Sequence, residues 1–303
     1  MSFVTGADTI NVDLLYSGLP RIPNEGEELF ASDFTVRLGG GIPATLLNLH
    51  GLNVPVSLQT ALGQDIFSGF ATAEIKKFGI EPVNFYQGHG IPLNVSTAIL
   101  TPADRTFVSY GNSPQDSDEL DQMIYESASG AKIAQMGWGS LQVYRKLKQE
   151  GTLLLFDTGW EDDLSLSRYR EQLSLADYYT PNQKEALKIT GTDTPQKAAE
   201  VLAQYFEKVI VKLDSAGCLI QENGVQRIVP SLPGITCVDA TGAGDAFSAG
   251  FLYGLYHNYA FSECVLFGNI TGGTCVTGVG CLTNRCTEEE LLSLFHAYHY
   301  LLD

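Results

Sequence analysis

Val238-Asp239-Ala240-Thr241-Gly242-Ala243-Gly244-Asp245-Ala246-Phe247 is the stretch that decides the fold, and it leads into an uncharged, helix-like run ending at Tyr253. Gly-Ala-Gly permits a tight turn and leaves backbone N–H groups unscreened at a helix start, where the macrodipole adds positive potential. Residues 242–244 are therefore predicted to form an anion-binding nest. Asp245 follows at the helix start, where its carboxylate can accept a proton from a hydroxyl nucleophile while the nest stabilises a transferring group.

Other interpretations of this stretch stay open on the motif alone. Asp245 could only cap the helix, and the glycines could only form a turn. A Walker A loop is excluded because no Gly-Lys dipeptide occurs, and a dinucleotide-binding Gly-x-Gly-x-x-Gly fails because Phe247 stands at its last position. An α/β hydrolase using Ser248 is an alternative, since the residues around it nearly match a nucleophile elbow.

Strands and helices alternate along the chain around this stretch. The alternation favours a largely parallel sheet with helices on both faces, which is a three-layer αβα sandwich. No internal repeat or low-complexity linker divides the sequence, so we expect a single domain over residues 1–303. The predicted strands are Val54–Leu58, Lys132–Met136, Thr152–Phe156, Val209–Leu213 and Cys218–Gln221, and the predicted helices are Ala44–Gly51, Phe67–Phe78, Leu141–Glu150, Thr194–Phe206 and Asp245–Leu255.

Two segments interrupt the alternation. Leu14–Val36 contains two prolines and then alternates, and Leu93–Tyr110 alternates around the turn Thr101–Asp104. Both are typical of antiparallel ribbon. They could pair into one small sheet that covers a ligand cleft, or they could be ordinary edge strands of the main sheet.

The composition excludes several classes of function. The chain carries 18 Lys+Arg against 35 Asp+Glu, and a formal net charge of −17 repels nucleic acid. No basic residue precedes an apolar run at the N-terminus, so we expect no secretory signal and a cytoplasmic location. Residues 264–284 are uncharged, but their Gly, Thr and Asn content predicts a buried helix and a loop rather than a membrane span. The six cysteines form no Cys-x-x-Cys pair and are expected to be reduced and mostly buried.

A second glycine-rich segment, Leu38-Gly39-Gly40-Gly41-Ile42-Pro43-Ala44, opens another predicted helix about 200 residues upstream of Asp245. With this segment in place, the chain resembles the ribokinase-like (PfkB) carbohydrate kinases over nearly its whole length. Several motifs in the family's order are more specific than any single one. The motifs are Ile10-Asn11-Val12-Asp13, Gly39-Gly40, Ala61-Leu62-Gly63-Gln64-Asp65, Thr180-Pro181-Asn182-Gln183-Lys184-Glu185, Val211-Lys212-Leu213-Asp214-Ser215-Ala216-Gly217, and Asp239–Asp245.

The resemblance implies a fold and a reaction. The fold would be a ribokinase-like αβα core with a small antiparallel β lid made from about 13–38 and 93–110, and the lid would pair with a second subunit to form a homodimer. The reaction would transfer the γ-phosphoryl of ATP to a hydroxymethyl group, with Mg²⁺ bridging the phosphates. Asp245 would take the hydroxyl proton, and the N–H groups of Gly242, Ala243 and Gly244 would stabilise the phosphoryl charge.

The resemblance also implies binding roles for other residues. On the acceptor side, Asn11 and Asp13 would bind sugar hydroxyls, and Gly39, Gly40 and Gly41 would let the sugar approach the backbone. On the ATP side, Asn182 and Glu185 would order Mg²⁺ and phosphates through water. Lys212, Asp214 and Gly217 would bind the phosphates and ribose, and Asn269 would bind the adenine. Thr241 is a further cofactor-binding position, and with Asp239 it could supply oxygens to K⁺.

The sequence departs from the family pattern near the acceptor. Many family members carry Asn at position 44 and some carry Lys at position 41, whereas this chain has Ala44 and Gly41. Asp214 stands where Gly is usual, and Asp157-Thr158-Gly159-Trp160 replaces a common Asp-Pro-Asn-x-Arg. We expect an ATP-dependent kinase of a free pentose or hexose. A nucleoside kinase of the same family and a catalytically idle sugar-binding protein on this fold are the alternatives.

The charge of the predicted lid bears on the acceptor. The first lid segment carries four acidic residues, which disfavours a second phosphate on the acceptor. A sugar-phosphate kinase would need Lys or Arg there. The acidic residues are Glu25, Glu27, Glu28 and Asp33, and the only basic candidates are Arg21, Arg37 and Arg105.

Overall fold

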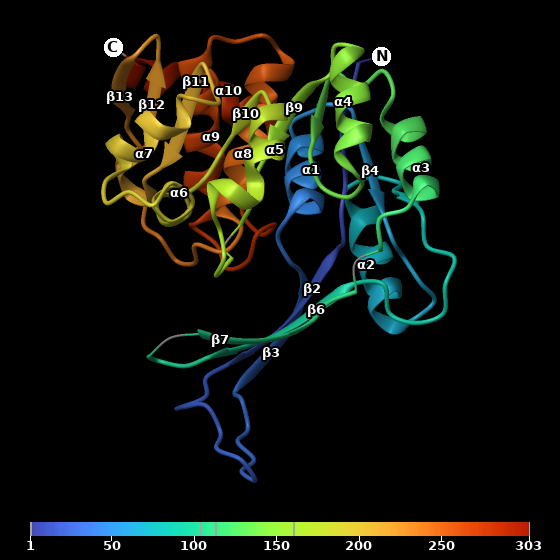
Figure 1. Cartoon of the computed structure of the whole chain (residues 1–303). Helices are drawn as coiled ribbons and strands as arrows, with labels where there is room; N and C mark the ends of the chain where they lie inside the picture. Colours follow the sequence, from blue (N-terminus) through green and yellow to red (C-terminus); the bar gives the residue numbers. More distant parts are fainter. Residues whose placement is uncertain (1, 104, 113, 160, 303) are drawn as a thin grey trace.

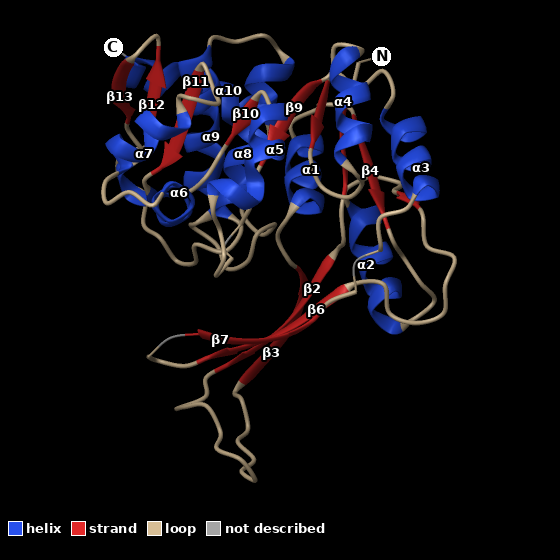
Figure 2. Cartoon of the chain, in the orientation of Figure 1, coloured by secondary structure: helices blue, strands red, loops and turns tan. Residues whose placement is uncertain are grey.

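The computed structural model describes residues 2–103, 105–112, 114–159 and 161–302. Asp104, the end of the predicted turn, and Trp160 lie outside the described residues, as do the two end residues of the predicted domain. The main sheet is parallel, with the strand order β10-β9-β8-β1-β4-β5 (Figure 1; Figure 2). Its strands are β1 (Val4–Ala7), β4 (Val56–Thr60), β5 (Val83–Asn84), β8 (Ile133–Gln135), β9 (Leu153–Phe156) and β10 (Tyr178–Tyr179).

Helices cover both faces of this sheet, so the predicted three-layer αβα sandwich is confirmed. One face carries a core built with α1 (Ile42–Gly51), α2 (Ile66–Lys77), α8 (Ala243–Tyr256), α9 (Phe261–Cys275) and α10 (Glu288–Tyr298). The other face carries a separate core built with α3 (Asp118–Ala128), α4 (Leu141–Gln149), α5 (Leu166–Leu175), α6 (Gln183–Thr190) and α7 (Pro195–Leu202).

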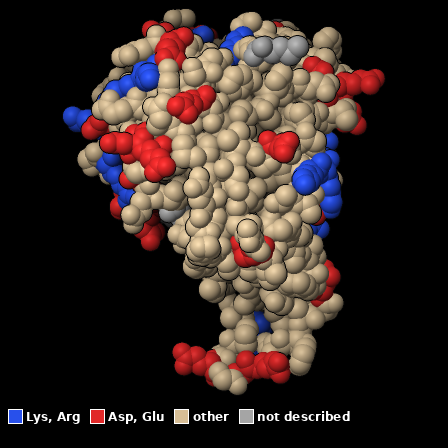
Figure 3. Space-filling model, turned by 90° about the vertical axis from the view of Figure 1, so that its right-hand side faces the viewer, with Lys and Arg blue, Asp and Glu red and all other residues tan. Residues whose placement is uncertain are grey.

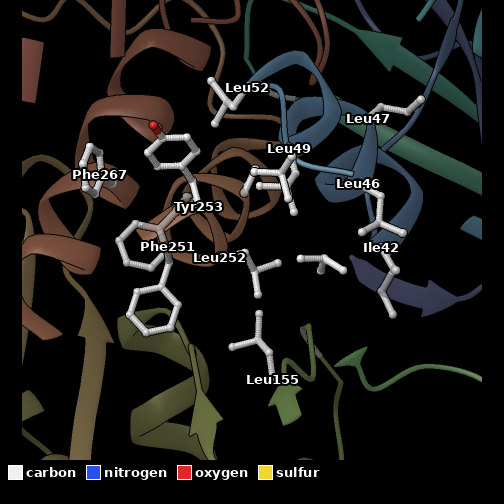
Figure 4. Packing of buried hydrophobic residues seen from close by; sticks show 14 of the residues in the cluster. Ile42, Leu46, Leu47, Leu49, Leu52, Leu155, Phe251, Leu252, Tyr253 and Phe267 are labelled. Carbon is white, nitrogen blue, oxygen red and sulfur yellow. The ribbon is translucent and has the colours of Figure 1, made fainter. Parts of the chain in front are cut away.

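Packing between α1 and α8 positions the site. Ile42 and Leu46 on α1 and Leu252 on α8 are buried together over Leu155 of the sheet (Figure 4). Gly250 lets α8 approach α9, since a Cβ there would lie 2.7 Å from the carbonyl carbon of Phe267. The starts of α1 and α8 therefore meet at the carboxyl edge of the parallel strands, where ligands bind in open α/β sheets.

Two of the predicted strands pair differently from the expectation. β11 (Lys208–Lys212) and β12 (Cys218–Glu222) were expected in the parallel sheet, but they are antiparallel to each other and continue to β13 (Val225–Val229). Only a short 3₁₀ turn, Asp214–Ala216, joins the first two. A parallel connection needs a crossover of a dozen or more residues, so this linker permits only a hairpin.

The lid is a second sheet that projects from the body (Figure 1). Its strands are β2 (Asn11–Ser17), β3 (Asp33–Leu38), β6 (Asn94–Leu100) and β7 (Arg105–Tyr110), in the order β3-β2-β6-β7. β2 with β3 and β6 with β7 are antiparallel pairs, as predicted, and β2 joins β6 in parallel. This junction confirms that the two segments form one sheet and removes the edge-strand alternative.

Candidate active site

The loop between β3 and α1 consists of three glycines, and each lies against a different carboxylate. A Cβ on Gly39 would lie 2.8 Å from Asp13 Oδ2, and a Cβ on Gly40 would collide with Asp245 Oδ2. Gly41, at φ +101°, faces Asp8. Gly39 and Gly40 therefore leave no room for a side chain, and Gly41 has a positive φ that favours glycine.

Asp245 lies in the first turn of α8, directly after the glycines of the predicted nest. The N–H of Gly41 donates to its carboxylate. Burial raises the pKa of Asp245 to about 7, and the nearby carboxylates of Asp157 and Asp8 add to the increase, while Lys212 opposes it. A carboxylate with this pKa can hold or release a proton near neutral pH, which suits a general base.

Lys212 brings a positive charge to the same point. A Cβ on Gly244 would lie 3.3 Å from Lys212 Nζ, and the ammonium lies 3.4 Å from Asp157 Oδ2. Its pKa is raised by Asp157 and Glu185 despite burial, so the amine stays charged. This position beside the nest suits a phosphate contact, and contacts of Lys212 with the phosphates and ribose of ATP stay predictions.

Asp157 is a part of this site that the sequence analysis did not assign to any role. It follows β9 at the carboxyl edge of the sheet, and Thr180 Oγ1 donates to its Oδ2 over 3.4 Å. The signal was available, because a carboxylate directly after a strand of a parallel sheet lies on the edge where the other site residues gather.

Asn182 and Glu185 form a capping box at the start of α6. Asn182 Oδ1 accepts from the Glu185 N–H over 3.0 Å, and Glu185 Oε2 accepts from the Asn182 N–H over 2.8 Å. Glu185 is only 5% exposed, and burial together with Asp157 raises its pKa. A helix cap alone needs no such burial beside a second carboxylate and a lysine, and a role of Glu185 toward Mg²⁺ and the phosphates stays a prediction.

The acceptor side is built by Asn11 and Asp13 on β2. Asn11 Nδ2 donates to the Gly40 carbonyl over 2.7 Å, and Asn11 Oδ1 accepts from Asn94 Nδ2 over 2.8 Å. Asn11 therefore holds the glycine loop and the lid strand β6 together. Burial raises the pKa of Asp13 to about 6.

Three residues predicted to bind the cofactor, Asn269, Gly217 and Asp214, follow Lys212 in the chain. Asn269 on α9 donates to the carbonyls of Val229 and Pro230, both over 3.0 Å, so its amide holds α9 against the end of β13. Gly217 is required by packing, because a Cβ there would lie 2.5 Å from the Ser231 nitrogen. Asp214 is exposed at φ +51°, which explains why Gly is usual at this position. Direct contacts of these residues with ATP stay predictions.

Asp239 ties two loops together beside the nest. Its Oδ1 accepts from the N–H and hydroxyl of Thr241 over 2.9 and 2.7 Å, and its Oδ2 accepts from the Gly280 N–H over 2.9 Å. This carboxylate therefore holds the loop at Gly280 against the turn before α8. A K⁺ ion at these oxygens stays a prediction.

The acidic residues of the first lid segment do not lie at the site. Glu25, Glu27 and Glu28 are exposed in the loop between β2 and β3, which extends beyond the lid (Figure 1), and acidic side chains gather at the narrow tip (Figure 3). Arg21 pairs with Glu27 in that loop, and Arg37 donates to the carbonyl of Val279. The reason for excluding a phosphorylated acceptor is therefore corrected: the negative charge facing the glycine loop comes from Asp8, Asp13 and Asp245.

The serine hydrolase alternative is excluded by the position of Ser248. The residue lies inside α8 and is 1% exposed, and its hydroxyl has no hydrogen-bond partner among the described residues. Among the residues that the structure describes, no base contacts the hydroxyl to activate it, and its burial keeps substrate away.

The cysteines and helices agree with the other sequence predictions. Five of the six cysteines are free and buried, and Cys237 is free and exposed. In the described part of the chain, no helix has the length and apolar character needed to cross a bilayer.

Comparisons with known proteins agree with this geometry. The family model for pfkB family carbohydrate kinases matches residues 2–288. A ribokinase of Haemophilus influenzae is 24% identical over 97% of this chain and 99% of the relative, and a cytidine kinase of Thermococcus kodakarensis is 26% identical over 79% of this chain and 88% of the relative. The solved structure of Arabidopsis thaliana ribokinase complexed with ribose and ATP is similar with a TM-score of 0.81 at 22% identity, covering 97% of this chain and 99% of that one. This likeness confirms the ribokinase-like fold.

Proposed function

The chain belongs to the pfkB family of carbohydrate kinases, and from this premise we propose that it phosphorylates a hydroxymethyl group of a free pentose or hexose, with Asp245 as the general base. The family's members are ATP-dependent kinases, so ATP is the donor. The observation that carries the proposal is the position of the Asp245 carboxylate, between the glycine loop on the acceptor side and Lys212 on the phosphate side.

The geometry supports an in-line transfer. The acceptor oxygen forms a bond to the γ-phosphorus while the bond from that phosphorus to the bridging oxygen of ADP breaks, and the hydroxyl proton goes to Asp245. The N–H groups of Gly242 and Gly244 would stabilise the charge that develops on the phosphoryl oxygens, whereas the Ala243 N–H donates to the Ala240 carbonyl over 3.3 Å. The ammonium of Lys212 neutralises part of the same charge.

The residues of this site fit a Mg²⁺ ion that the protein binds through water molecules. Among the described residues, no three His, Cys, Asp or Glu side chains converge to hold a metal directly. The carboxylates of Glu185 and Asp157 lie beside Lys212, and Mg²⁺ usually keeps several waters when it binds nucleotide phosphates. We therefore infer that Glu185 and Asp157 hold Mg²⁺ through water, and that Mg²⁺ supplies charge neutralisation on the phosphates.

Glu185→Ala tests this role. We expect the Mg²⁺ concentration for half-maximal rate to rise roughly tenfold or more, because an outer-shell partner is removed. The substitution also removes a capping box, so it should lower the free energy of unfolding by about 1 kcal/mol. The measurement is a Mg²⁺ titration of the rate at saturating ATP and acceptor.

Glu290→Ala is the matched control for this test. Glu290 forms an equivalent capping box with Thr287 at the start of α10, and it is exposed. Its loss should cost similar stability and leave the Mg²⁺ titration unchanged. If both variants show the wild-type Mg²⁺ curve, Glu185 is only a helix cap.

The acceptor is tested by ADP release over a panel at fixed ATP and Mg²⁺. We expect turnover of ribose or fructose and none of fructose 6-phosphate or tagatose 6-phosphate, because three carboxylates face the glycine loop. Turnover of adenosine, inosine or pseudouridine alone would favour the nucleoside alternative, for which Gly41 leaves room. ATP binding without turnover of any acceptor would favour the idle binding protein.

Three further proposals concern the assembly and the cation. We propose that the chain is one kinase domain whose lid comprises about 13–38 and 93–110, and that the lid pairs with a second copy in a homodimer. Exposed apolar side chains on the lid support the pairing, namely Phe34, Phe107, Val108 and Tyr110. The third proposal places K⁺ beside Asp239 and Thr241.

A further inference from the structure

Asp8 is a carboxylate at the acceptor side for which the proposed reaction has so far no use. It directly follows β1, so it lies at the carboxyl edge of the central strand of the sheet. Its backbone is fixed to the neighbouring strand β4, because the Asp8 N–H donates to the Gln59 carbonyl over 3.1 Å and Thr60 Oγ1 donates to the Asp8 carbonyl over 2.7 Å. The side chain is thereby placed under the glycine loop.

Two backbone groups orient the carboxylate. Asp8 Oδ1 accepts from the Thr9 N–H over 2.7 Å, and the Ile42 N–H at the start of α1 also donates to this side chain. The helix has no cap from its own N-cap residue, Gly41. Asp8 is therefore held in one orientation by the sheet on one side and by α1 on the other.

The absence of a side chain at Gly41 leaves room next to this carboxylate. A Cβ built on Gly41 would lie 3.6 Å from Asp8 Oδ2 and 3.6 Å from Asn11 Nδ2, which are ordinary contact distances. The space on this side of Gly41 is therefore open, and it is bordered by the carboxylate of Asp8 and the amide of Asn11. The same loop brings Asp245 and Asp13 to its other two glycines, so the space belongs to the acceptor pocket.

Lys212 partly offsets the charge of Asp245, but it forms no ion pair with any of the three carboxylates at the glycine loop. Within the described ranges, no Lys, Arg or His forms an ion pair with Asp8, Asp13 or Asp245. Lys212 pairs with Asp157, and Arg37 is turned to the Val279 carbonyl and Thr283. A hydroxyl that donates to Asp8 lowers the cost of its burial, whereas an acidic group of the ligand raises that cost.

We propose that Asp8 is a specificity-determining residue: its carboxylate accepts a hydrogen bond from a hydroxyl of the acceptor next to Gly41 and rejects acceptors that carry a carboxylate or phosphate there. This inference rests on the proposed kinase function and narrows its acceptor to neutral polyhydroxy compounds. It assigns to Asp8 the recognition for which Gly41 and Ala44 offer no side-chain polar group.

Asp8→Asn tests the proposal, because the amide keeps the size and one accepting oxygen for Thr9 and removes the charge. ADP release is measured at saturating ATP and about pH 8 with ribose and fructose as neutral acceptors and with 2-keto-3-deoxygluconate and gluconate as acidic ones. We expect the KM for the neutral acceptor to rise about tenfold or more while kcat and the KM for ATP change less than about threefold. The ratio of kcat/KM between neutral and acidic acceptors should fall by about tenfold.

Asp177→Asn is the matched control. Asp177 accepts a backbone N–H from Leu154 over 2.8 Å, but it precedes β10 and so lies at the opposite edge of the sheet. Its loss should lower the melting temperature and leave every KM unchanged. If Asp8 only supports α1, Asp8→Asn will lower the melting temperature in the same way and change neutral and acidic acceptors equally, and the proposal is then wrong.

Binding measurements separate this inference from the kinase proposal. If the wild-type protein phosphorylates no acceptor, the kinase proposal fails, and calorimetric titration with the same four compounds then decides on Asp8. Neutral compounds that bind the wild type about tenfold more tightly than Asp8→Asn support Asp8 even without turnover. Equal binding to both proteins, no binding by the wild type, or a wild-type preference for the acidic compounds contradicts it.

Discussion

Asp245→Asn is expected to lower kcat by roughly 10²–10⁴-fold, because a positioned general base contributes about that much to a proton transfer. The amide keeps the shape of the side chain and cannot accept the proton that the hydroxyl loses during phosphoryl transfer. The KM for ATP should change little, since the lost interaction acts in the transition state and not in nucleotide binding. Steady-state kinetics with the best acceptor of the panel measures both quantities.

The pH dependence gives the same residue a second test. The pKa of Asp245 is raised to about 7 by burial, so in the wild-type protein the base loses activity as the pH falls through about 7. The small residual kcat/KM of Asp245→Asn should therefore show no such decrease as the pH falls through about 7. If the variant shows the same decrease as the wild type, another group is responsible for it.

Folding stability distinguishes a chemical effect from unfolding. The pKa of Asp245 is higher in the folded chain than its ordinary value of 3.8, so the ionised carboxylate destabilises the fold above about pH 7, and this penalty disappears as the pH falls toward 4. Asp245→Asn should therefore melt at a higher temperature than the wild type at about pH 8. Asp118→Asn, in the exposed first turn of α3, is the control and should change neither activity nor pH profile. Turnover of Asp245→Asn within about threefold of the wild type would contradict the base assignment.

The sequence predicted those parts of the site that depend on local backbone chemistry. Gly-Ala-Gly followed by Asp245 predicted a helix start with an acid beside it, and α8 begins at Ala243. The three glycines at 39–41 predicted a second helix start, and α1 begins at Ile42. In both cases the residues that shape the turn also stand at the site, so a few adjacent positions carry the whole signal.

The parts that the sequence did not predict depend on which strands become neighbours. Asp8 and Asp157 each follow a strand without a glycine-rich turn, so their position after a strand is the only local sign of their place at the site. Their meeting with Asp245 is decided by the order of β1, β8 and β9 in the sheet. The sequence prediction attributes the negative charge near the acceptor to Glu25 and its neighbours, because they cluster in the sequence. The structure places these residues in an exposed loop beyond the lid.

Gly242→Ala is expected to have the second large effect, because Gly242 combines two constraints. Its φ of +78° lies in the left-handed region, where a side chain costs about 1 kcal/mol or more. A Cβ at this position would also collide with the Cβ of Cys281 and lie 2.5 Å from the Cys281 Cα. Cys281 is 1% exposed, and its thiol donates to the Leu38 carbonyl over 3.2 Å, so the backbone there has no free space to move into.

The collision must therefore be relieved by the turn before α8, which carries the N–H groups of the nest. Displacing one such donor costs roughly 10²–10³-fold in kcat, and overpacking adds about 1–3 kcal/mol of instability. Gly234→Ala is the matched control, because Gly234 has the same φ of +78° but no atom within 4 Å of its Cβ position. It should show only the cost of the left-handed backbone and keep full activity. If Gly242→Ala is destabilised by the expected amount and still turns over at the wild-type kcat, the start of α8 does not stabilise the phosphoryl group, and Lys212 must supply that stabilisation without it.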